Sequence, residues 1–373
     1  MKDFQITLTL QTHLLQGGPL AGELDPAHRL RGPSVRGLLH AFARALVGPL
    51  VAADPARTRE AEAALLGAAR GDDGGSVTFR VQDVSDNPLK ACEERFKNCV
   101  GKPEKGSSPG YSADQSRTLV FRPRPNAVRT NPRFPAALWA VVWSAFTFGS
   151  LGKRARRGYG DLVIRSARGV PAQLPLFTDP PLDEKDLARR LQRGFASARQ
   201  LLIDWLRAED NLTRQIARSK GEPVDRRRLF EPVEPAATSP SNQVDSFFQI
   251  WSMQSVRIGK RYPGDEGAMK DLIDCCHRAV GTTRQSAEAF LAAIGAPLPR
   301  DAARNTQKKV KRLASPLWFR LFKLANRRFV LVVSVSRRVA AKDNAWKAAE
   351  ELLKDVGATP DDCTVAVMAA RSD

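Results

Sequence analysis

The segment from Gly149 to Gly160, GSLGKRARRGYG, combines residue types that bind phosphate groups. Its four glycines let backbone N–H groups approach a phosphate closely, and its four cations supply the opposite charge. Tyr159, between Gly158 and Gly160, offers an aromatic face to an unpaired base. The spacing matches neither GxxxxGK[ST] nor GxGxxG, so we predict a basic glycine-rich loop rather than a nucleotide-binding fingerprint. The four cations are Lys153, Arg154, Arg156 and Arg157.

A second basic segment runs from Arg29 to Ala45, where Ser34 is a plausible N-cap and a helix is expected from Val35. On that helix the side chains at positions i, i+4 and i+8 share one face, opposite an apolar stripe that includes Leu38 and Phe42. The helix N-terminus adds partial positive charge that suits a phosphate. We expect this face and the glycine-rich loop to lie at the same end of their domain. The three basic side chains of the face are Arg36, His40 and Arg44.

The charge of the whole chain supports a polyanionic partner. Its 373 residues carry 59 Lys and Arg against 40 Asp and Glu, a formal net charge of +19. Thirteen basic residues and a single acid fall between Arg300 and Lys342. Clusters of one sign repel themselves, so a nucleic acid that neutralises them is the simplest explanation. A charge that serves only solubility is the alternative.

Other features narrow the class of protein. No apolar run approaches the roughly 20 residues that span a bilayer, which predicts a protein without a membrane partner. The five cysteines form no CxxC pair, as in a protein of the reducing cytoplasm, and no spacing predicts a metal site or a cofactor.

The elements that position these segments suggest an α+β fold. Residues 4–10 alternate apolar and polar side chains like a half-buried strand, and residues 135–148 read as a buried helix. With the helix from Val35, the order is strand, helix, strand, strand, helix, strand, which is the ferredoxin-like pattern. A polar insertion is expected at about 86–116. The other expected strands are 76–84, 118–122 and 162–165.

The pattern then repeats. A proline-rich linker at 169–182 precedes a charged helix and a loop at about 221–243. We therefore predict two tandem ferredoxin-like domains with insertions, residues 1–168 and 183–373. The second is expected to contain strands at 247–256, 316–324, 329–336 and 363–369, a hairpin turn at Asn326, and helices at 267–294 and 343–356.

Three blocks of sequence resemble one family. RLRGPSVRGLLHAFARAL (residues 29–46) and GSLGKRARRGYGDL (residues 149–162) are similar to the first block and the glycine-rich loop of the RAMP superfamily of CRISPR proteins. KRLASPLW (residues 311–318) resembles a block of the first subunit of the type III-B Cmr complex. The blocks keep the expected order.

The resemblance implies two RAMP-type, RRM-like ferredoxin folds and a place among other subunits in an RNA-guided ribonucleoprotein for antiviral defence. It implies contact with the 3′ part of a guide CRISPR RNA, with target RNA as a further partner, and no nuclease activity. The residues expected at RNA are Arg29, Arg31, Ser34, Arg36, Gly37, His40, Arg44, Gly152, Lys153, Arg154, Arg156, Arg157, Gly158, Tyr159, Gly160, Lys311, Arg312 and Ser315.

Two alternatives stay open from the sequence. A metal-independent endoribonuclease that trims guide precursors is one, and His40 on the basic face is its only candidate for a general acid or base. A basic scaffold whose charge serves protein contacts is the other.

Overall fold

The structure is a computed structural model of the chain. It describes residues 3–16, 23–51, 55–67, 78–97, 103–152, 158–219, 251–264, 267, 317–338, 353–357 and 365–366.

The first sheet has four antiparallel strands in the order β2-β5-β1-β6. The predicted alternation of β1 is confirmed, because its apolar side chains are buried and the intervening polar ones are half-buried. This strand order, with the first and third strands of the unit in the centre, is that of the predicted ferredoxin-like fold. The strands are β1 (Phe4–Leu10), β2 (Phe79–Asp83), β5 (Ser116–Pro123) and β6 (Leu162–Arg168).

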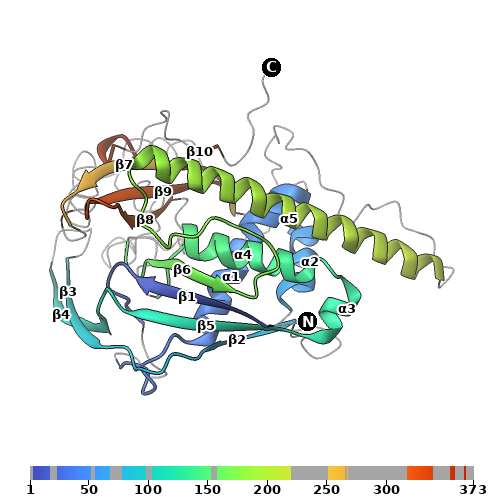
Figure 1. The fold of residues 1–373 in the computed structure, drawn as a ribbon, viewed down its shortest axis with the longest axis horizontal. Coiled ribbons are helices and arrows are strands. Elements are labelled where there is room, and N and C mark those ends of the chain that lie inside the picture. The colour runs from blue at the N-terminus through green and yellow to red at the C-terminus, as the bar shows by residue number, and fades with distance from the viewer. Residues whose placement is uncertain are drawn as a thin grey trace, which may run out of the picture.

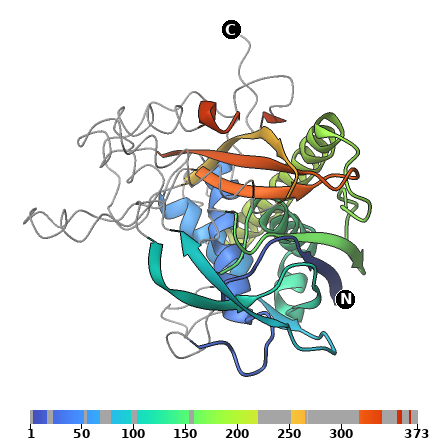
Figure 2. The same ribbon diagram turned by 90° about the vertical axis from the view of Figure 1, so that its left-hand side faces the viewer.

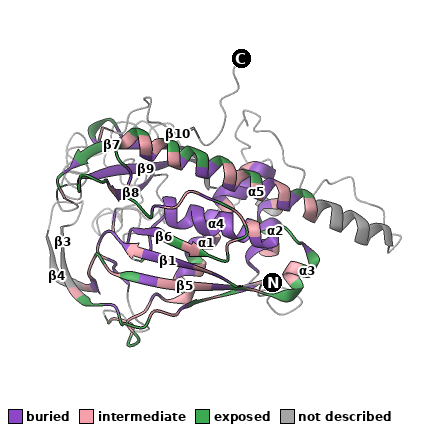
Figure 3. Cartoon of the chain, in the orientation of Figure 1, coloured by how far each residue is buried: buried purple, intermediate pink, exposed green. Residues whose placement is uncertain are grey.

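Two helices cover one face of this sheet (Figure 1). Helix α4 (Phe134–Phe148) is buried over nearly its whole length, as Figure 3 shows. Helix α1 (Gly32–Val47) begins two residues before the expected N-cap, so the assignment of Ser34 as N-cap is wrong. Arg31 occupies that position without a side-chain cap, and Pro33 stands in the first turn, where its fixed φ suits a helix start.

The first unit contains further helices and a hairpin besides its sheet and the two helices α1 and α4. Helix α2 (Pro55–Leu66), the 3-10 helix η1 (Gly48–Val51) and helix α3 (Pro125–Thr130) were not expected from the sequence. The insertion predicted at about 86–116 contains a two-stranded antiparallel hairpin, β3 (Ala91–Lys97) and β4 (Pro103–Tyr111). The base of this hairpin joins the sheet region through a bridge between Leu14 and Tyr111.

The proline-rich segment after β6 packs on the first unit. Trp139 and Trp143 of α4 donate their indole N–H groups to the carbonyl oxygens of Ala172 and Pro175, at 3.0 and 2.7 Å. Helix α5 (Glu184–Ser219) then lies along α4, and Gly194 allows the Trp143 ring to approach its backbone. The boundary at 169–182 stays a prediction.

A second four-stranded antiparallel sheet follows, in the order β10-β7-β9-β8. This repeats the strand order of the first sheet, as the tandem prediction requires. The hairpin turn is also confirmed, because Asn326 accepts a bond from the Arg328 N–H at 3.0 Å and Arg327 adopts φ +63°. The strands are β7 (Trp251–Tyr262), β8 (Leu317–Lys323), β9 (Phe329–Arg338) and β10 (Val365–Ala366).

The two sheets share one hydrophobic core. Helices α1 and α4 lie between the first sheet on one side and the second sheet with α5 on the other (Figures 1 and 2). The rings of Phe42 in α1 and Trp318 in β8 are 5.3 Å apart, and both side chains belong to the same buried cluster. The second sheet is therefore packed directly against α1, the helix that carries the second basic segment. The helix predicted at 267–294 lies, apart from Gly267, outside the described residues.

Candidate nucleic-acid interface

The ends of the glycine-rich loop form a narrow, closed neck between α4 and β6. Ser150 and Asp161 face each other in a bridge, and the Leu151 N–H bonds to the Gly160 carbonyl at 3.0 Å. Gly152, Gly158 and Gly160 have φ of +87°, +80° and +71°, which only glycine adopts at low cost. The glycines therefore make the neck possible, and residues 153–157 between them lie outside the described residues.

Residues 13–16, the chain that continues β1, run beside this neck. The Gly160 N–H donates to the His13 carbonyl at 2.9 Å, and a Cβ at Gly152 would lie 2.6 Å from the Leu15 carbonyl oxygen. On the other side, the Gln16 side-chain amide donates to the Arg29 carbonyl at 2.9 Å. Residues 13–16 thus connect the loop to the segment before α1.

That segment is fixed by a buried carboxylate. Asp83 accepts the Leu30 N–H at 2.9 Å and forms an ion pair of 2.9 Å with Arg117, and both charged side chains are 2% exposed. Arg29 donates to the Asp83 carbonyl at 2.9 Å, and Arg31 Nε lies 3.4 Å from Asp25 Oδ2. Buried ion pairs hold position when further hydrogen bonds support them, and here Arg117 Nε donates to Asp83 Oδ2 at 3.0 Å. Arg29 and Arg31 are half-buried at the start of α1.

The predicted basic face of α1 turns to α2 and β2. Arg36 donates to the carbonyl oxygens of Phe79 and Leu66, at 3.2 and 2.9 Å, and its guanidinium lies 4.9 Å from the centre of the Phe79 ring. Partial burial lowers the pKa of Arg36. His40 Nδ1 lies 2.7 Å from Glu62 Oε1, and Arg44 Nε lies 3.5 Å from the same oxygen. These three side chains therefore already have protein partners.

That this face and the loop lie at the same end of their domain stays a prediction, but the three basic side chains do not point toward Gly149. A Cβ at Gly149 would overlap Leu38 and Phe42, so this apolar side of α1 is the one that meets the loop. Leu38 and Phe42 each lie two residues, about 200° around the helix, from Arg36 and His40. The structure joins the loop to Arg29 through residues 13–16 instead.

A buried cluster lies under the neck. Asp161 is fully buried and accepts bonds from the Ser150 hydroxyl and, at 2.6 Å, from the Leu321 N–H of β8. Burial raises its pKa to about 6, against the opposing effects of Arg320, Ser150 and the Leu321 N–H. Arg320 of β8, 1% exposed, donates to the carbonyl oxygens of Phe146, Gly149 and Leu162. Burial lowers the pKa of this guanidinium to about 10.

Comparison with known proteins identifies the first unit. The sequence profile of the RAMP superfamily matches residues 7–163. These residues are therefore similar to the RAMP superfamily. A curated relative, CRISPR system Cmr subunit Cmr1-1 of Pyrococcus furiosus, is 28% identical over 205 residues, which are 51% of this chain and 56% of the relative. The match thus spans little more than half the length of that relative.

Two solved structures share the fold of the whole chain. Cmr1 from Pyrococcus furiosus in its apo form superposes with a TM-score of 0.54 over 99% of both chains, at 14% identity. A chain of the type III-B Cmr-beta complex, solved by cryo-EM with cognate target RNA and AMPPnP in the presence of ssDNA, gives 0.55 over 95% of this chain and 98% of that one, at 10% identity. The likeness confirms the predicted fold class, with two units of similar topology.

Apart from Arg31, Arg36, His40 and Arg44, described above, the predicted site residues fall into three groups. The ends of the glycine-rich loop, Gly152, Gly158, Tyr159 and Gly160, lie with Arg29 around residues 13–16. Ser34 and Gly37 lie on the first turns of α1, half-buried and exposed respectively. Lys153, Arg154, Arg156, Arg157, Lys311, Arg312 and Ser315 lie outside the described residues.

Sequence reasoning missed two features beside the glycine-rich loop. His13, rather than His40, is the histidine whose backbone binds the loop, and its Nδ1 lies 3.6 Å from Cys92 Sγ in the β3–β4 hairpin. Arg320 was counted with the basic surface, but it is buried and bonded to carbonyl groups. In the sequence, the only feature that drew attention to this region was the KRLASPLW block, which ends two residues before Arg320.

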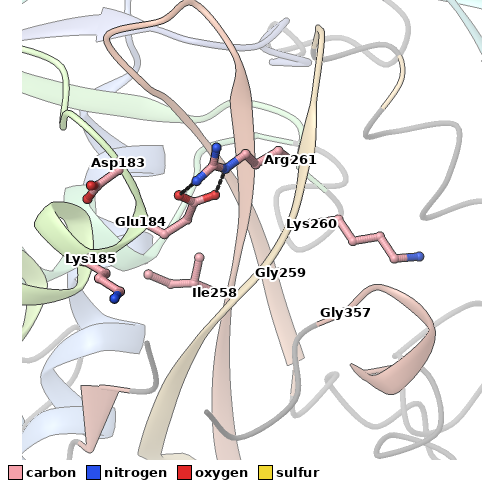
Figure 4. Close-up of a pocket in the computed structure, with 8 residues that line it drawn as sticks. All are labelled: Asp183, Glu184, Lys185, Ile258, Gly259, Lys260, Arg261 and Gly357. Atoms are coloured by element: carbon pink, nitrogen blue, oxygen red, sulfur yellow. Dashed lines mark hydrogen bonds and ion pairs between the residues drawn. The ribbon is translucent and has the colours of Figure 1, made fainter. Parts of the chain in front are cut away.

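A shallow pocket of about 380 Å³ lies where α5 meets β7 (Figure 4). Its main feature is a two-pronged ion pair in which Arg261 donates to both carboxylate oxygens of Glu184. The bond from Arg261 is the main reason that the pKa of Glu184 is lowered. Lys260 extends away from this pair and donates to the Asp355 carbonyl at 2.7 Å. The ion pair that lines this pocket thus connects the start of α5 to strand β7 of the second sheet.

The described residues contain no group of three or more His, Cys, Asp or Glu side chains that could hold a metal ion. Within the same ranges, no helix combines the length and the apolar character needed to cross a membrane.

Proposed function

We propose that this protein is an RNA-binding subunit of a type III-B CRISPR effector complex, without nuclease activity of its own. It would contact the 3′ part of the guide RNA, with target RNA as a further partner, and neighbouring subunits of the complex. The similarity to the RAMP superfamily, the Cmr1 relative and the fold shared over the whole chain support this proposal. The glycine-rich loop is the main observation in favour of RNA binding.

The loop suits a ribose-phosphate strand for a physical reason. Its neck is held by backbone bonds of Gly160 to Leu151 and His13, and four of the five residues between Gly152 and Gly158 are cations. A short fixed neck limits the conformations of those cations, so less entropy is lost when they bind phosphates. The adjacent Arg29 and Arg31 extend the positive charge to the start of α1, whose free N–H groups favour anions.

The loop can be tested by reversing its charge. In the variant with Arg154, Arg156 and Arg157 all changed to Glu, we expect single-stranded RNA to bind at least about a hundredfold more weakly at moderate salt, since several phosphate contacts are lost. The log–log slope of affinity against salt should also become shallower, by roughly 0.7 for each phosphate no longer neutralised. Filter binding over a salt series measures both quantities.

A matched control changes the same net charge at the other end of α4. Arg124, Arg129 and Arg133 are exposed near the start of α4, whereas the loop follows its last residue. Changing these three to Glu should reduce affinity far less. Equal losses in the two variants would mean that RNA responds only to net charge, and unchanged affinity of the loop variant would remove the loop from the site.

The endoribonuclease alternative has less support, because His40, its proposed general acid or base, is engaged with Glu62 on the side of α1 away from Gly149. Incubation with guide precursor RNA in EDTA tests it. Specific cleavage that disappears in His40→Ala would favour the nuclease. If no RNA is retained on native purification, the basic scaffold is favoured instead.

A further inference from the structure

Strand β8 of the second sheet holds both ends of the glycine-rich loop. The Arg320 guanidinium donates to Phe146 and Gly149 at the end of α4, and to Leu162 at the start of β6. These three carbonyl groups flank the loop on its two sides. One side chain from a strand more than 150 residues away in sequence therefore bridges the neck.

The adjacent residue completes the attachment. The Leu321 N–H donates to Asp161 Oδ2 at 2.6 Å, while Asp161 Oδ1 accepts the Ser150 hydroxyl. Asp161 in turn anchors the chain that continues β1, because its N–H donates to Thr12 Oγ1 at 3.0 Å and its carbonyl accepts the Gln11 N–H at 2.8 Å. The loop neck, β8 and residues 11–12 thus form one buried hydrogen-bonded cluster.

Burial makes this arrangement specific. A guanidinium that is 1% exposed needs partners for its donors, and the carbonyl groups of Phe146, Gly149 and Leu162 supply them for both terminal nitrogens only in their present geometry. The Arg320 guanidinium also lies 4.8 Å from the centre of the Phe322 ring on the same strand. Displacement of β8 would break the bonds from Arg320 to the three carbonyl groups and the bond from the Leu321 N–H to Asp161 Oδ2. The packing of β8 and the geometry of the neck therefore depend on each other.

We propose that Arg320 is a positioning residue for RNA binding, through which the second sheet fixes the neck of the glycine-rich loop. Arg320 does not contact RNA. It acts on affinity only through the loop, so the RNA site is a joint product of the two sheets. This inference rests on the proposed function of the loop in binding RNA.

The inference can be tested by a double-mutant cycle in the full chain. Arg320→Lys keeps the charge but cannot reach three carbonyls at once, and it should weaken single-stranded RNA binding by about tenfold, the equivalent of one lost charged hydrogen bond. In a background with Arg154, Arg156 and Arg157 changed to Gln, the same change should have almost no effect, because its route to RNA is gone. Equal fold-changes in both backgrounds would overturn the inference.

A control and a second readout separate this inference from the proposed function. Arg328→Gln removes one exposed charge from the β8–β9 turn and should change affinity little. Hydrogen exchange without RNA should accelerate at the amides of Leu151, Gly160 and Asp161 in Arg320→Lys, and not in Arg328→Gln. Slow exchange at these amides in Arg320→Lys would overturn the positioning role. Wild-type RNA affinity of the loop-Gln background would instead refute the proposed function.

Where Arg320→Lys does not fold, Ser150→Ala tests the same cluster from the loop side. It removes only the hydroxyl that donates to Asp161. Affinity should fall about threefold, as for one neutral hydrogen bond, and again only while the loop cations are present. A loss of the same size in the loop-Gln background would contradict the inference.

Discussion

The two basic segments that stand out in the sequence are built in different ways. On α1, the charged side chains meet partners within the same unit: Arg36 binds carbonyls of α2 and β2, and His40 and Arg44 share the carboxylate of Glu62. At the glycine-rich loop, the described contacts belong to the neck, where glycines, residues 13–16 and β8 hold the backbone. On α1, the cations connect the helix to α2 and β2. At the glycine-rich loop, backbone bonds in the neck hold the two ends of the segment that carries the cations.

The difference teaches that cation spacing alone does not identify a binding face. A half-buried arginine bonded to two carbonyls loses those bonds if it turns to a phosphate, so it gains little from RNA. The loop cations are instead the groups that we propose to bind phosphates. We therefore expect the largest effects on RNA binding at the loop and at its neck, with smaller effects along α1.

The largest effect is expected from Gly160→Ala. With φ at +71° and the Leu151 carbonyl oxygen in the space of the new Cβ, alanine forces the neck apart. The free energy of unfolding should fall by about 4 kcal/mol, the sum of left-handed strain and a backbone clash. Chemical denaturation measures this, and RNA binding should be lost with it.

Gly264→Ala is the control for that change, because a Cβ at Gly264 meets no atom within 4 Å. It should leave the unfolding midpoint within the range of surface substitutions, about 0.5 kcal/mol. A Gly160→Ala protein as stable as the Gly264→Ala protein would show that the neck tolerates a side chain, and the comparison between the two segments would lose its basis.

An effect of intermediate size concerns pH at Asp161. Its pKa in the folded protein is raised from 3.8 to about 6, mainly by burial, so between these values the folded state binds more protons than the unfolded state. The contribution of this group to stability therefore falls as pH rises from about 4 to 6, by on the order of 3 kcal/mol.

Asp161→Asn removes this titration. The difference in unfolding free energy between the Asn variant and the wild type should shift in favour of the variant across pH 4 to 6, and should be constant above about pH 7. Parallel urea titrations at several pH values measure this difference in unfolding free energy. The contributions of the other carboxylates cancel, because both proteins contain them. A difference that does not change with pH would mean that Asp161 is ionised as easily in the folded protein as in the unfolded chain.

Much of the fold could be predicted because its signals are local. The alternation in residues 4–10, the apolar run of α4 and the turn at Asn326 each depend on residues that are neighbours in the chain. Helix α2 was missed because its sequence, rich in alanine and charge, has no strong apolar face. The start of α1 was misplaced because Pro33 suits the first turn as well as Ser34 suits a cap.

The site was harder to predict because its partners are distant in sequence. The glycine-rich loop was recognisable from composition, but nothing near Arg320 reveals that its bonds go to Gly149 and Leu162. The same holds for Arg36, whose acceptors Leu66 and Phe79 lie 30 and 43 residues away. A pattern in the sequence gives the face on which a cation lies, whereas its bonding depends on tertiary packing.

The smallest effect is expected at Gly37, and it tests whether α1 belongs to the RNA site at all. Gly37 is exposed within α1, and a Cβ there would meet no atom within 4 Å. Alanine is the better helix former, so Gly37→Ala should raise the free energy of unfolding by about 0.5 to 1 kcal/mol. If RNA approaches the backbone at this position, as we propose, the more stable variant should nevertheless bind RNA several-fold more weakly, because the added methyl group would occupy the space of the RNA strand.

Denaturation and filter binding on the same preparation measure the two effects of Gly37→Ala. A gain in stability together with a loss of affinity cannot arise from a change in folding. A gain in stability with undiminished affinity would assign α1 to the protein scaffold and leave the loop and its neck as the RNA site.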